Sequence, residues 1–168
     1  MKSLKICRIG EDYINYLSKK ESRVPHNKNQ RRPYVGIVLL VSGYSYFVPM
    51  ESPKPNHANI KPGMHIMKLE KGSLGLLGFN NMIPVHDSAI IDFDIDAVAD
   101  TSYAELLRRQ ITFINRHKSD VFDHASRTYY AQVNGKNKFM HKICCDFKLL
   151  ERMCVKYDPN FKLKKGKR

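Results

Sequence analysis

Apolar residues form short runs over the first half of the chain and recur at helical spacing over the second half. Short apolar runs that end at Gly, Pro or polar residues predict strands. Only Ser42-Gly43 separates two of these runs, which predicts a β-hairpin. Pro49 lacks the N–H that a ladder needs, so its strand is expected to be a sheet edge or to be bulged. A short helix is expected at 12–17, and strands are expected at 3–9, 34–41, 44–50, 64–69, 74–79, 82–85 and 89–93.

The second half of the chain has the pattern of amphipathic helices, with apolar residues three and four positions apart from Tyr103 onward. It predicts one helix that starts near 103 behind an N-cap supplied by Asp100-Thr101-Ser102, a second over 119–133 and a third over 143–157. Strands followed by helices favour an α+β fold with an antiparallel, meandering sheet. We expect one domain over residues 1–160. The tail 161–168, FKLKKGKR, has no core pattern, as in a disordered extension.

Charge narrows the class of partner. Lys and Arg total 29 against 16 for Asp and Glu, a net charge of +13, which favours a polyanion such as nucleic acid. A membrane is disfavoured, because the longest apolar run, 35–41, is far shorter than the roughly 20 residues of a spanning helix. Residues 1–13 contain no apolar signal-peptide core. We therefore expect a cytoplasmic protein.

The cysteines give no sign of a metal site. Cys7, Cys144, Cys145 and Cys154 include no CxxC pair, and the adjacent Cys144 and Cys145 fall inside the third predicted helix. Reduced, buried thiols are the favoured interpretation, with zinc or a disulfide as the alternatives. The sequence also lacks a P-loop, a dinucleotide fingerprint and an HExxH motif, so we expect no cofactor.

Polar residues at both ends of the hairpin point to chemistry. Arg31 and Arg32 precede its first strand, and Ser52, Lys54 and His57 follow its second. In an antiparallel pair the start of one strand lies beside the end of the other, so these residues should meet at one sheet end. Such groups suffice to cleave RNA without a metal: one accepts the 2′-hydroxyl proton, cations neutralise the phosphate and an acid protonates the leaving oxygen. Basic loop ends also occur in proteins that only bind RNA, so a non-catalytic binding module remains the alternative.

The order of these residues resembles a known family. A basic residue, a strand of the type aromatic–apolar–Gly–Ile–Val–Leu, a Gly turn and a second strand ending in Ser-Pro-Lys are typical of the ToxN/AbiQ family. These proteins are endoribonuclease toxins of type III toxin–antitoxin systems. The pattern is carried here by residues 32–39, Gly43 and Ser52-Pro53-Lys54. Further similarity covers most of the chain, over residues 4–157.

The resemblance implies a compact, strongly twisted, barrel-like antiparallel core like that of the MazF/Kid toxins, with added helices mainly in the C-terminal half. It implies sequence-selective, metal-independent cleavage of cellular and phage RNA in a bacterial cytoplasm, leaving 2′,3′-cyclic phosphate ends. It also implies a small repeat antitoxin RNA built of pseudoknots. The toxin trims this RNA from a longer transcript and is inhibited by it in a closed protein–RNA ring, and the strong positive charge agrees with such a partner.

Catalytic roles follow from the same resemblance. Ser52 matches the family's central hydroxyl, and Lys54 matches the lysine two positions later. Arg32 stands where relatives often carry lysine, and its guanidinium suits a phosphate clamp better than proton transfer. Tyr13 matches an early tyrosine that contributes to the site in relatives.

One more candidate for the site and one residue of open role lie in the same stretch of sequence. His57 is suggested by its residue type, because histidine exchanges protons near neutral pH. Glu51 stands where some relatives carry threonine. A carboxylate beside a phosphate is unfavourable unless it points away or pairs with Arg, so its role stays open.

Other residues are candidate RNA contacts. Tyr34 either stacks on an unpaired base or packs within the sheet. The helical cations either form a solvated face or contact RNA if they line the same groove as the site. The basic candidates are Lys28, Arg23 and Arg31 in the loop before the hairpin, and Arg108, Arg109, Arg116 and Lys118 in the helical half.

Overall fold

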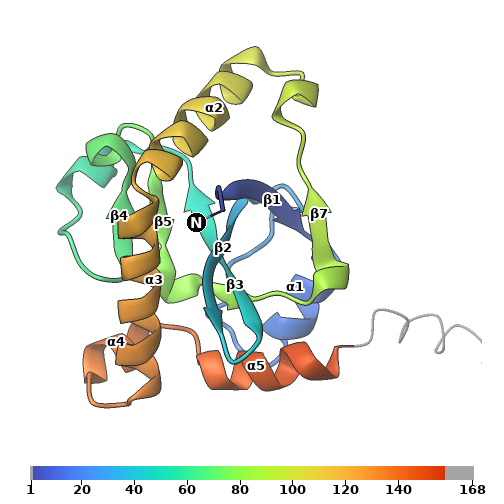
Figure 1. The fold of residues 1–168 in the computed structure, drawn as a ribbon, viewed down its shortest axis with the longest axis vertical. Helices are drawn as coiled ribbons and strands as arrows, with labels where there is room; N and C mark the ends of the chain where they lie inside the picture. Colours follow the sequence, from blue (N-terminus) through green and yellow to red (C-terminus); the bar gives the residue numbers. More distant parts are fainter. Residues whose placement is uncertain (1, 158–168) are drawn as a thin grey trace, which may run out of the picture.

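The computed structural model describes residues 2–157 and has one antiparallel sheet with helices around it (Figure 1). The tail 161–168, with Pro159 before it, lies outside the described residues. Neighbouring strands follow the order β4-β5-β3-β2-β1-β7, and β6 pairs with β3. The strands are β1 (Lys5–Ile9), β2 (Tyr34–Val41), β3 (Tyr44–Glu51), β4 (Ile66–Lys68), β5 (Leu76–Gly78), β6 (Ile83–Pro84) and β7 (Ile90–Asp92).

The sheet is open, not closed into a barrel. In the described part of the chain, β4 pairs only with β5 and β7 pairs only with β1, so the two ends of the order do not meet. The predicted α+β class is confirmed, and the helices lie mainly in the C-terminal half. The likeness to MazF/Kid toxins stays a prediction.

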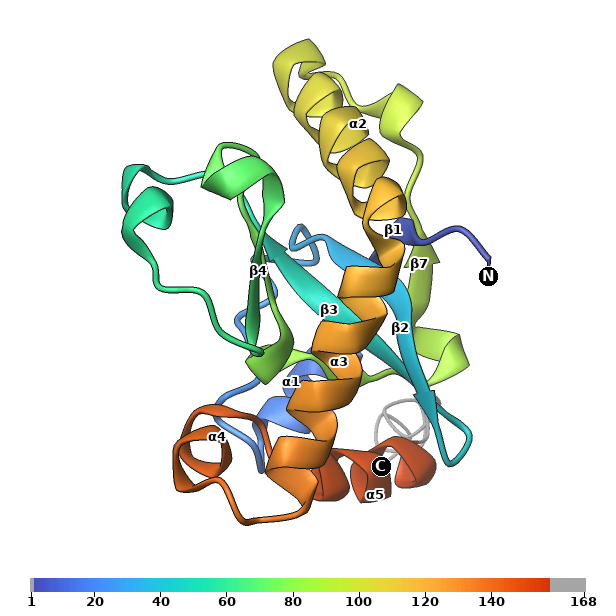
Figure 2. The ribbon, with the colours of Figure 1, turned by 60° about the vertical axis from the view of Figure 1, so that its left-hand side comes forward.

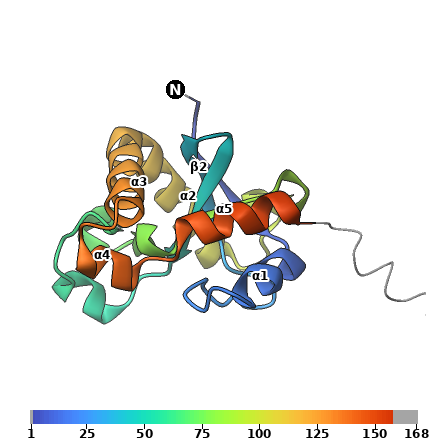
Figure 3. The same cartoon turned by 90° about the horizontal axis from the view of Figure 1, so that it is seen from below.

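The helices surround the hairpin formed by β2 and β3. Figure 2 shows α2 and α3 as one bent arm beside these strands, and α5 crosses near the hairpin turn (Figure 3). Asp100 caps α2 as predicted, since its Oδ1 accepts the N–H of Tyr103 at 3.0 Å. No helix in residues 2–157 has the length and apolar character needed to cross a membrane. The helices are α1 (Glu11–Ser18), α2 (Thr101–Arg116), α3 (Lys118–Val133), α4 (Lys138–Ile143) and α5 (Phe147–Lys156), with 3₁₀ turns η1 (Pro55–Asn59), η2 (Leu69–Gly72), η3 (Phe79–Asn81), η4 (Asp87–Ala89) and η5 (Ile95–Ala97).

The third predicted helix corresponds to α5 and starts later than expected, while α4 before it was not predicted; Cys144 lies in extended conformation between the two. Two N-caps define these helices. Asn137 Oδ1 accepts the N–H of Met140 at 3.1 Å, and Asp146 Oδ1 accepts that of Leu149 at 3.0 Å. Apolar spacing continues across the break, whereas capping side chains compete with the helical backbone and start a new helix. The predicted helix over 143–157 is therefore confirmed from Phe147 to Lys156, and its expected start was four residues too early.

The four cysteines are free and buried, as predicted. Burial raises the pKa of Cys7 and of Cys144 to about 12, so these thiols stay protonated near neutral pH. Among the described residues, no group of three or more His, Cys, Asp or Glu side chains is placed to hold a metal ion. The cysteines therefore serve as small core residues.

β3 is the central strand, so the prediction that Pro49 marks a sheet edge was wrong. On one side β3 pairs with β2, and on the other it pairs first with β6 and then with β5. The N–H of Met50 points to β2 and donates to Pro33 O at 3.0 Å, so the nitrogen of Pro49 faces the other side, in the gap between β6 and β5. The irregularity lies in β2, where the register shifts between Gly36 and Leu39.

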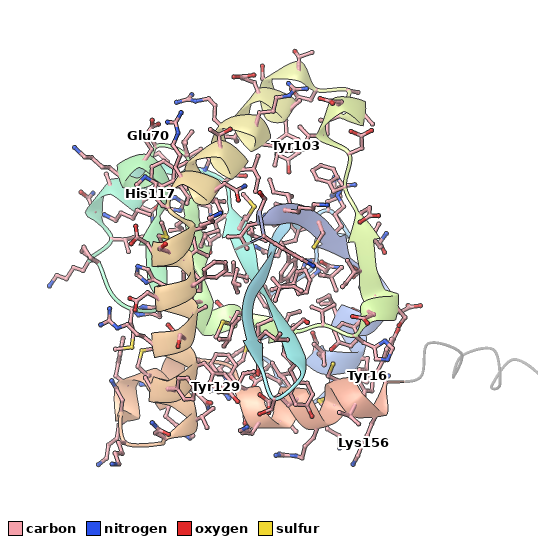
Figure 4. All side chains as sticks on the ribbon, in the orientation of Figure 1. Tyr16, Glu70, Tyr103, His117, Tyr129 and Lys156 are labelled. Carbon is pink, nitrogen blue, oxygen red and sulfur yellow. The ribbon has the colours of Figure 1, made fainter. Side chains whose placement is uncertain are left out.

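The core holds a buried carboxylate that fixes the helices to β3. The Glu151 side chain is 5% exposed and lies 3.1 Å from Lys148 Nζ. Its Oε1 accepts the hydroxyls of Tyr46 in β3, at 2.9 Å, and of Tyr129 in α3, at 2.7 Å. Figure 4 shows Tyr129 where α3 meets α5. A buried carboxylate is tolerated when it is fully paired, so this cluster anchors both helices to the strand that leads into the candidate site.

Candidate active site

The hairpin register brings the predicted basic and polar residues to one end of the sheet. Tyr34 pairs with Pro49, and Met50 N–H donates to Pro33 O at 3.0 Å. Arg31 and Arg32, which precede β2, therefore lie at the same end of the sheet as Glu51 and Ser52, where β3 ends. The predicted juxtaposition of the two hairpin ends is confirmed.

The loop before β2 is tightly organised. Lys28, Asn29 and Gln30 all have positive φ, at 52°, 55° and 66°. Gln30 and Glu11 exchange two hydrogen bonds, because Gln30 N–H donates to Glu11 Oε2 at 2.8 Å and Glu11 N–H donates to Gln30 Oε1 at 3.1 Å. These bonds tie the loop to the start of α1, so it presents its basic side chains from a fixed backbone.

Both arginines use part of their guanidinium group to hold this loop. Arg32 Nε donates to His26 O at 2.7 Å, and Arg31 Nε donates to Lys28 O at 3.0 Å. Each bond uses one of the five donors of a guanidinium. The loop thus orients the two cations while most of their donors are left for an anion.

Residues 52–56, which include Ser52 and Lys54, are exposed. The next residue, His57, is buried. The side chain of His57 is 2% exposed, and its Nδ1 accepts the N–H of Lys54 at 3.4 Å. The N–H of His57 in turn donates to Lys54 O at 3.0 Å. In the neutral ring the proton is therefore assigned to Nε2.

Glu51 lies between the lysine and the histidine. Its Oε2 is 3.5 Å from Lys54 Nζ and 3.7 Å from His57 Nε2. The carboxylate therefore pairs with Lys54 and faces His57 instead of pairing with an arginine. Its side chain is 42% exposed, so one side of the carboxylate is open to solvent. The sequence pattern did not reveal this arrangement, although Glu, Lys and His at positions i, i+3 and i+6 of one tight loop are a usable signal.

Two glycines let the η2 segment, which comprises η2 and the residues after it up to Gly75, pack against the site. A Cβ on Gly75 would lie 1.9 Å from Glu51 O, and one on Gly72 would lie 3.2 Å from the His57 carbonyl carbon. Both have positive φ, +98° and +100°. Lys68 Nζ also donates to Ala58 O at 2.9 Å, which fixes the far end of the loop. The backbone of this segment therefore packs against the Ser52–His57 loop and holds it in place.

Tyr13 and Tyr34 do not reach the surface. Each is 0% exposed, and the Tyr13 hydroxyl donates to Pro84 O at 2.6 Å. Burial raises the pKa of both phenols above its usual value. Tyr13 is therefore a core residue instead of a catalytic group, and Tyr34 packs within the sheet instead of stacking on RNA. Neither the resemblance nor the strand pattern could show that other parts of the chain bury these two tyrosine side chains.

Arg23 is engaged with protein groups. Its Nε and Nη2 donate to the buried carboxylate of Glu21 at 2.7 and 2.8 Å, and its Nη1 donates to His141 O at 3.2 Å. Burial raises the pKa of Glu21, but hydrogen bonds from Arg23 and from Asp146 N–H outweigh it and lower that pKa below its ordinary value. Arg23 holds α4 in place, so the predicted RNA contact at this position is not supported.

The arginines of α2 line a shallow cleft beside η2. Arg109 Nη2 lies 3.1 Å from Glu70 Oε2, and Arg108 Nη2 lies 2.8 Å from Asp96 Oδ1. Figure 4 shows Glu70 near His117, at the end of α2. The other side of this segment supports the candidate site through Gly72 and Gly75. The cleft has a volume of about 270 Å³ and is lined by Glu70, Leu74, Glu105, Arg108, Arg109, Thr112, Phe113 and Arg116.

A larger cleft of about 1080 Å³ lies elsewhere, between β1, β2, β7 and the α2–α3 arm. Its lining is mostly apolar and includes Ile37, Phe47, Phe93 and Phe122. It contains none of the candidate catalytic residues. The candidate catalytic residues therefore lie at the basic end of the sheet and not in this cleft.

The fold and the site define a small basic protein that gathers basic and polar side chains at one end of a central hairpin. Residues 5–155 match the family model described as Toxin ToxN, type III toxin–antitoxin system. The chain therefore belongs to the ToxN family of type III toxin–antitoxin systems, as its resemblance implied.

Individual relatives agree with this assignment. The endoribonuclease ToxN of Bacillus thuringiensis subsp. kurstaki is 32% identical over 162 residues, which cover 91% of this chain and 84% of the relative. The endoribonuclease AbiQ of Lactococcus lactis subsp. lactis is 30% identical over 166 residues, covering 92% and 90%. A solved structure from a bacterial type III system, described as showing selective toxin inhibition by a non-coding RNA pseudoknot, has a TM-score of 0.82 at 31% identity and covers 93% of this chain and 98% of its own. The structure of AbiQ, described as a lactococcal anti-phage endoribonuclease, also has a TM-score of 0.82, at 27% identity with the same coverage.

Proposed function

We propose that this protein is the endoribonuclease toxin of a type III toxin–antitoxin system and that it cleaves RNA without a metal. The observation that carries the proposal is the hairpin end, where Arg31 and Arg32 lie beside the segment that contains Ser52 and Lys54. Membership of the ToxN family supports the same activity.

The proposed reaction is attack by a ribose 2′-oxygen on the adjacent phosphorus, which expels the 5′-oxygen and leaves a 2′,3′-cyclic phosphate. The Ser52 hydroxyl and the Lys54 ammonium donate to the phosphoryl oxygens as their negative charge grows. Arg32 neutralises the phosphate from the neighbouring strand. Both Ser52 and Lys54 are exposed, so an RNA phosphate reaches them from solvent.

The proposed partner is a small repeat antitoxin RNA with a pseudoknot fold. The toxin cuts its repeats from a longer transcript and is then held inactive by them in a closed protein–RNA ring in the bacterial cytoplasm. The net charge of +13 supports such a partner, because each neutralised phosphate releases counterions. When free of this RNA, the toxin cuts cellular and phage transcripts. Candidate contacts beyond the catalytic centre are Arg31, Lys28, Arg108, Arg109, Arg116 and Lys118.

The test compares cleavage of a mixed RNA substrate by RNA-free wild type and by Ser52→Ala, in EDTA. We expect wild type to produce fragments with 2′,3′-cyclic phosphate ends and Ser52→Ala to be slower by about 10²–10³-fold. Ser102→Ala, which replaces an exposed serine on α2, is the matched control and should cleave like wild type.

Two other outcomes contradict the proposal in different ways. If neither protein cleaves while both still bind RNA, the chain is a binding module and not a nuclease. If Ser52→Ala cleaves as fast as wild type, the nuclease stands but Ser52 is not in its centre. A substrate with 2′-deoxyribose at the cut site should resist cleavage, because it lacks the attacking group.

A further inference from the structure

The proposed function leaves open which group accepts the 2′-hydroxyl proton. From the position of Glu51 we infer that its carboxylate is the general base of the cleavage step and that His57 is the residue that positions it. This inference rests on the proposed function, since it assigns a role within that reaction.

The first support is the place of the carboxylate. Glu51 ends β3 immediately before Ser52, and its Oε2 lies 3.5 Å from Lys54 Nζ. A charged hydrogen bond from Lys54 Nζ to a phosphate oxygen would be about 2.8 Å long. A phosphate held by Ser52 and Lys54 therefore brings the ribose next to it within reach of Glu51. The open side of the carboxylate, with 42% of the side chain exposed, faces the solvent from which RNA arrives.

The second support is the chemistry of the neighbouring groups. The guanidinium groups of the arginines and the ammonium group of a solvated lysine are protonated at neutral pH, so they do not accept a proton. His57 is 2% exposed, and its Nδ1 already accepts the N–H of Lys54. Tyr13 is buried and donates to Pro84 O. Of the site residues, Glu51 is the one that combines a basic oxygen with access to solvent.

The third support is the fixed environment behind Glu51. His57 Nε2 faces the carboxylate at 3.7 Å, while its Nδ1 is occupied by the backbone of Lys54. Gly72 packs against the His57 backbone and Cβ, where an added methyl group would come within 3.2 Å. The imidazole is therefore fixed in a pose that directs a donor at Glu51. Catalytic hydrogen bonds are often long before the substrate binds and shorten in the complex.

The proton balance closes within this site. Glu51 takes the proton of the 2′-hydroxyl as the 2′-oxygen bonds to phosphorus, and the bond from phosphorus to the 5′-oxygen breaks. Lys54 gives a proton to the departing 5′-oxygen. The protonated Glu51 and the neutral Lys54 amine are then adjacent, so a proton passes from the carboxyl to the amine and restores the starting ion pair. No oxidant, reductant or metal enters this balance.

The charged and titratable groups around Glu51 are few. Lys54 and His57 come from its own loop. Arg31 and Arg32 come from the adjoining strand end. The supporting η2 segment contacts Glu51 through the backbone of Gly75, and Glu70 of that segment pairs with Arg109 instead.

The experiment is a single-turnover comparison of wild type and Glu51→Gln, with RNA affinity measured separately on a 2′-deoxy substrate. We expect Glu51→Gln to cleave about 10²–10⁴-fold more slowly. Its affinity for RNA should be equal or higher, because a negative charge has been removed. The wild-type rate should fall as the pH is lowered and the base is protonated, and this acidic limb should be missing in Glu51→Gln.

The matched control is Asp123→Asn, which also converts an exposed carboxylate paired with a cation, 3.4 Å from Arg127 on α3, into an amide. It should cleave like wild type. Cleavage by Glu51→Gln at or above the wild-type rate would overturn the assignment while leaving the nuclease intact. A wild type that does not cleave would instead overturn the proposed function.

The positioning role of His57 needs its own readout. His57→Gln retains a donor near the place of Nε2, whereas His57→Leu does not. We expect His57→Leu to lose at least about tenfold in rate and to shift the acidic limb of the pH profile, and His57→Gln to recover much of both. Equal pH profiles for the two variants, each with folded protein, would contradict this role.

Discussion

Glu51 and Glu151 each pair with a lysine three residues away, but their surroundings differ. The Glu51–Lys54 distance is 3.5 Å with 42% of the carboxylate side chain exposed, and the Glu151–Lys148 distance is 3.1 Å with 5% exposed. Two tyrosine hydroxyls complete the shell of Glu151, whereas Glu51 has a histidine on one side and solvent on the other. The same pair of residue types is therefore structural where it is enclosed and available for chemistry where one side is open.

The largest effect on stability should come from breaking the enclosed pair. Glu151→Ala leaves the hydroxyls of Tyr46 and Tyr129 without their acceptor, and we expect the free energy of unfolding to fall by about 3–5 kcal/mol. Chemical denaturation measures this, with Glu105→Ala as an exposed control that should stay within about 0.5 kcal/mol of wild type. A loss below about 1 kcal/mol would show that the buried cluster does not anchor the helices.

Removing Lys54, the exposed lysine, should slow cleavage strongly and change the free energy of unfolding little. Lys54→Met should slow cleavage by about 10²–10³-fold, because a donor to the developing charge is lost. Its free energy of unfolding should change by less than about 1 kcal/mol, since exposed ion pairs contribute little. Lys148→Met is the mirror control and should lower stability while the folded protein cleaves normally. If both lysine variants lost stability equally, the contrast between the two pairs would fail.

Gly75→Ala should perturb the site through its support. The added methyl group would lie 1.9 Å from Glu51 O, at a residue with φ of +98°. We expect a stability loss of about 1–3 kcal/mol together with slower cleavage, because Glu51 and Ser52 must shift. Gly135→Ala is the matched control: its φ is +67°, but nothing lies within 4 Å of the added atom. Its stability loss should be smaller, and its cleavage should be unchanged.

The smallest effect should be seen in the pH dependence of stability at Glu21, a third paired carboxylate. Its pKa is lowered in the folded state from the ordinary value of 4.5. Its stabilising contribution is therefore complete above pH 4.5 and is lost as the pH falls through the lowered folded-state pKa. Urea denaturation should show that Glu21→Gln is less stable than wild type at pH 6 and that the gap narrows at pH 3. A gap that does not depend on pH would contradict this interpretation.

The hairpin and the meeting of its two ends could be predicted from sequence. Ser42-Gly43 fixes the turn, and antiparallel pairing then requires Arg32 and Ser52 to lie at the same end. The long helices could also be predicted, since their spacing is regular and Asp100 caps the first of them. In both cases the information is local, within one element or between two adjacent ones.

Most errors involve long-range contacts, apart from the start of α5, which the local Asp146 cap sets. β3 is central because β5 and β6, from residues 76–84, cover its second side, and nothing near Pro49 encodes this. Whether Tyr13 and Tyr34 are exposed depends on segments distant in the chain, and Pro84 O accepts the Tyr13 hydroxyl across 71 positions. The role of Glu51 depends on a loop that Gly72 and Gly75 of the η2 segment support. Tertiary context of this kind overrides local pattern.

The bond between Tyr46 and Glu151 has a consequence for the order in which parts of the chain become fixed. The strand that leads into the candidate catalytic loop is held by a carboxylate 105 positions later in the chain, in the last helix described. A ribosome-bound or truncated chain that stops before this helix has two core tyrosine hydroxyls without an acceptor and a β3 that is not yet fixed. We expect the hairpin to form from local contacts, whereas a fixed placement of Glu51 and Ser52 needs α5. A chain without α5 should therefore hold the candidate site less firmly than a chain that contains it.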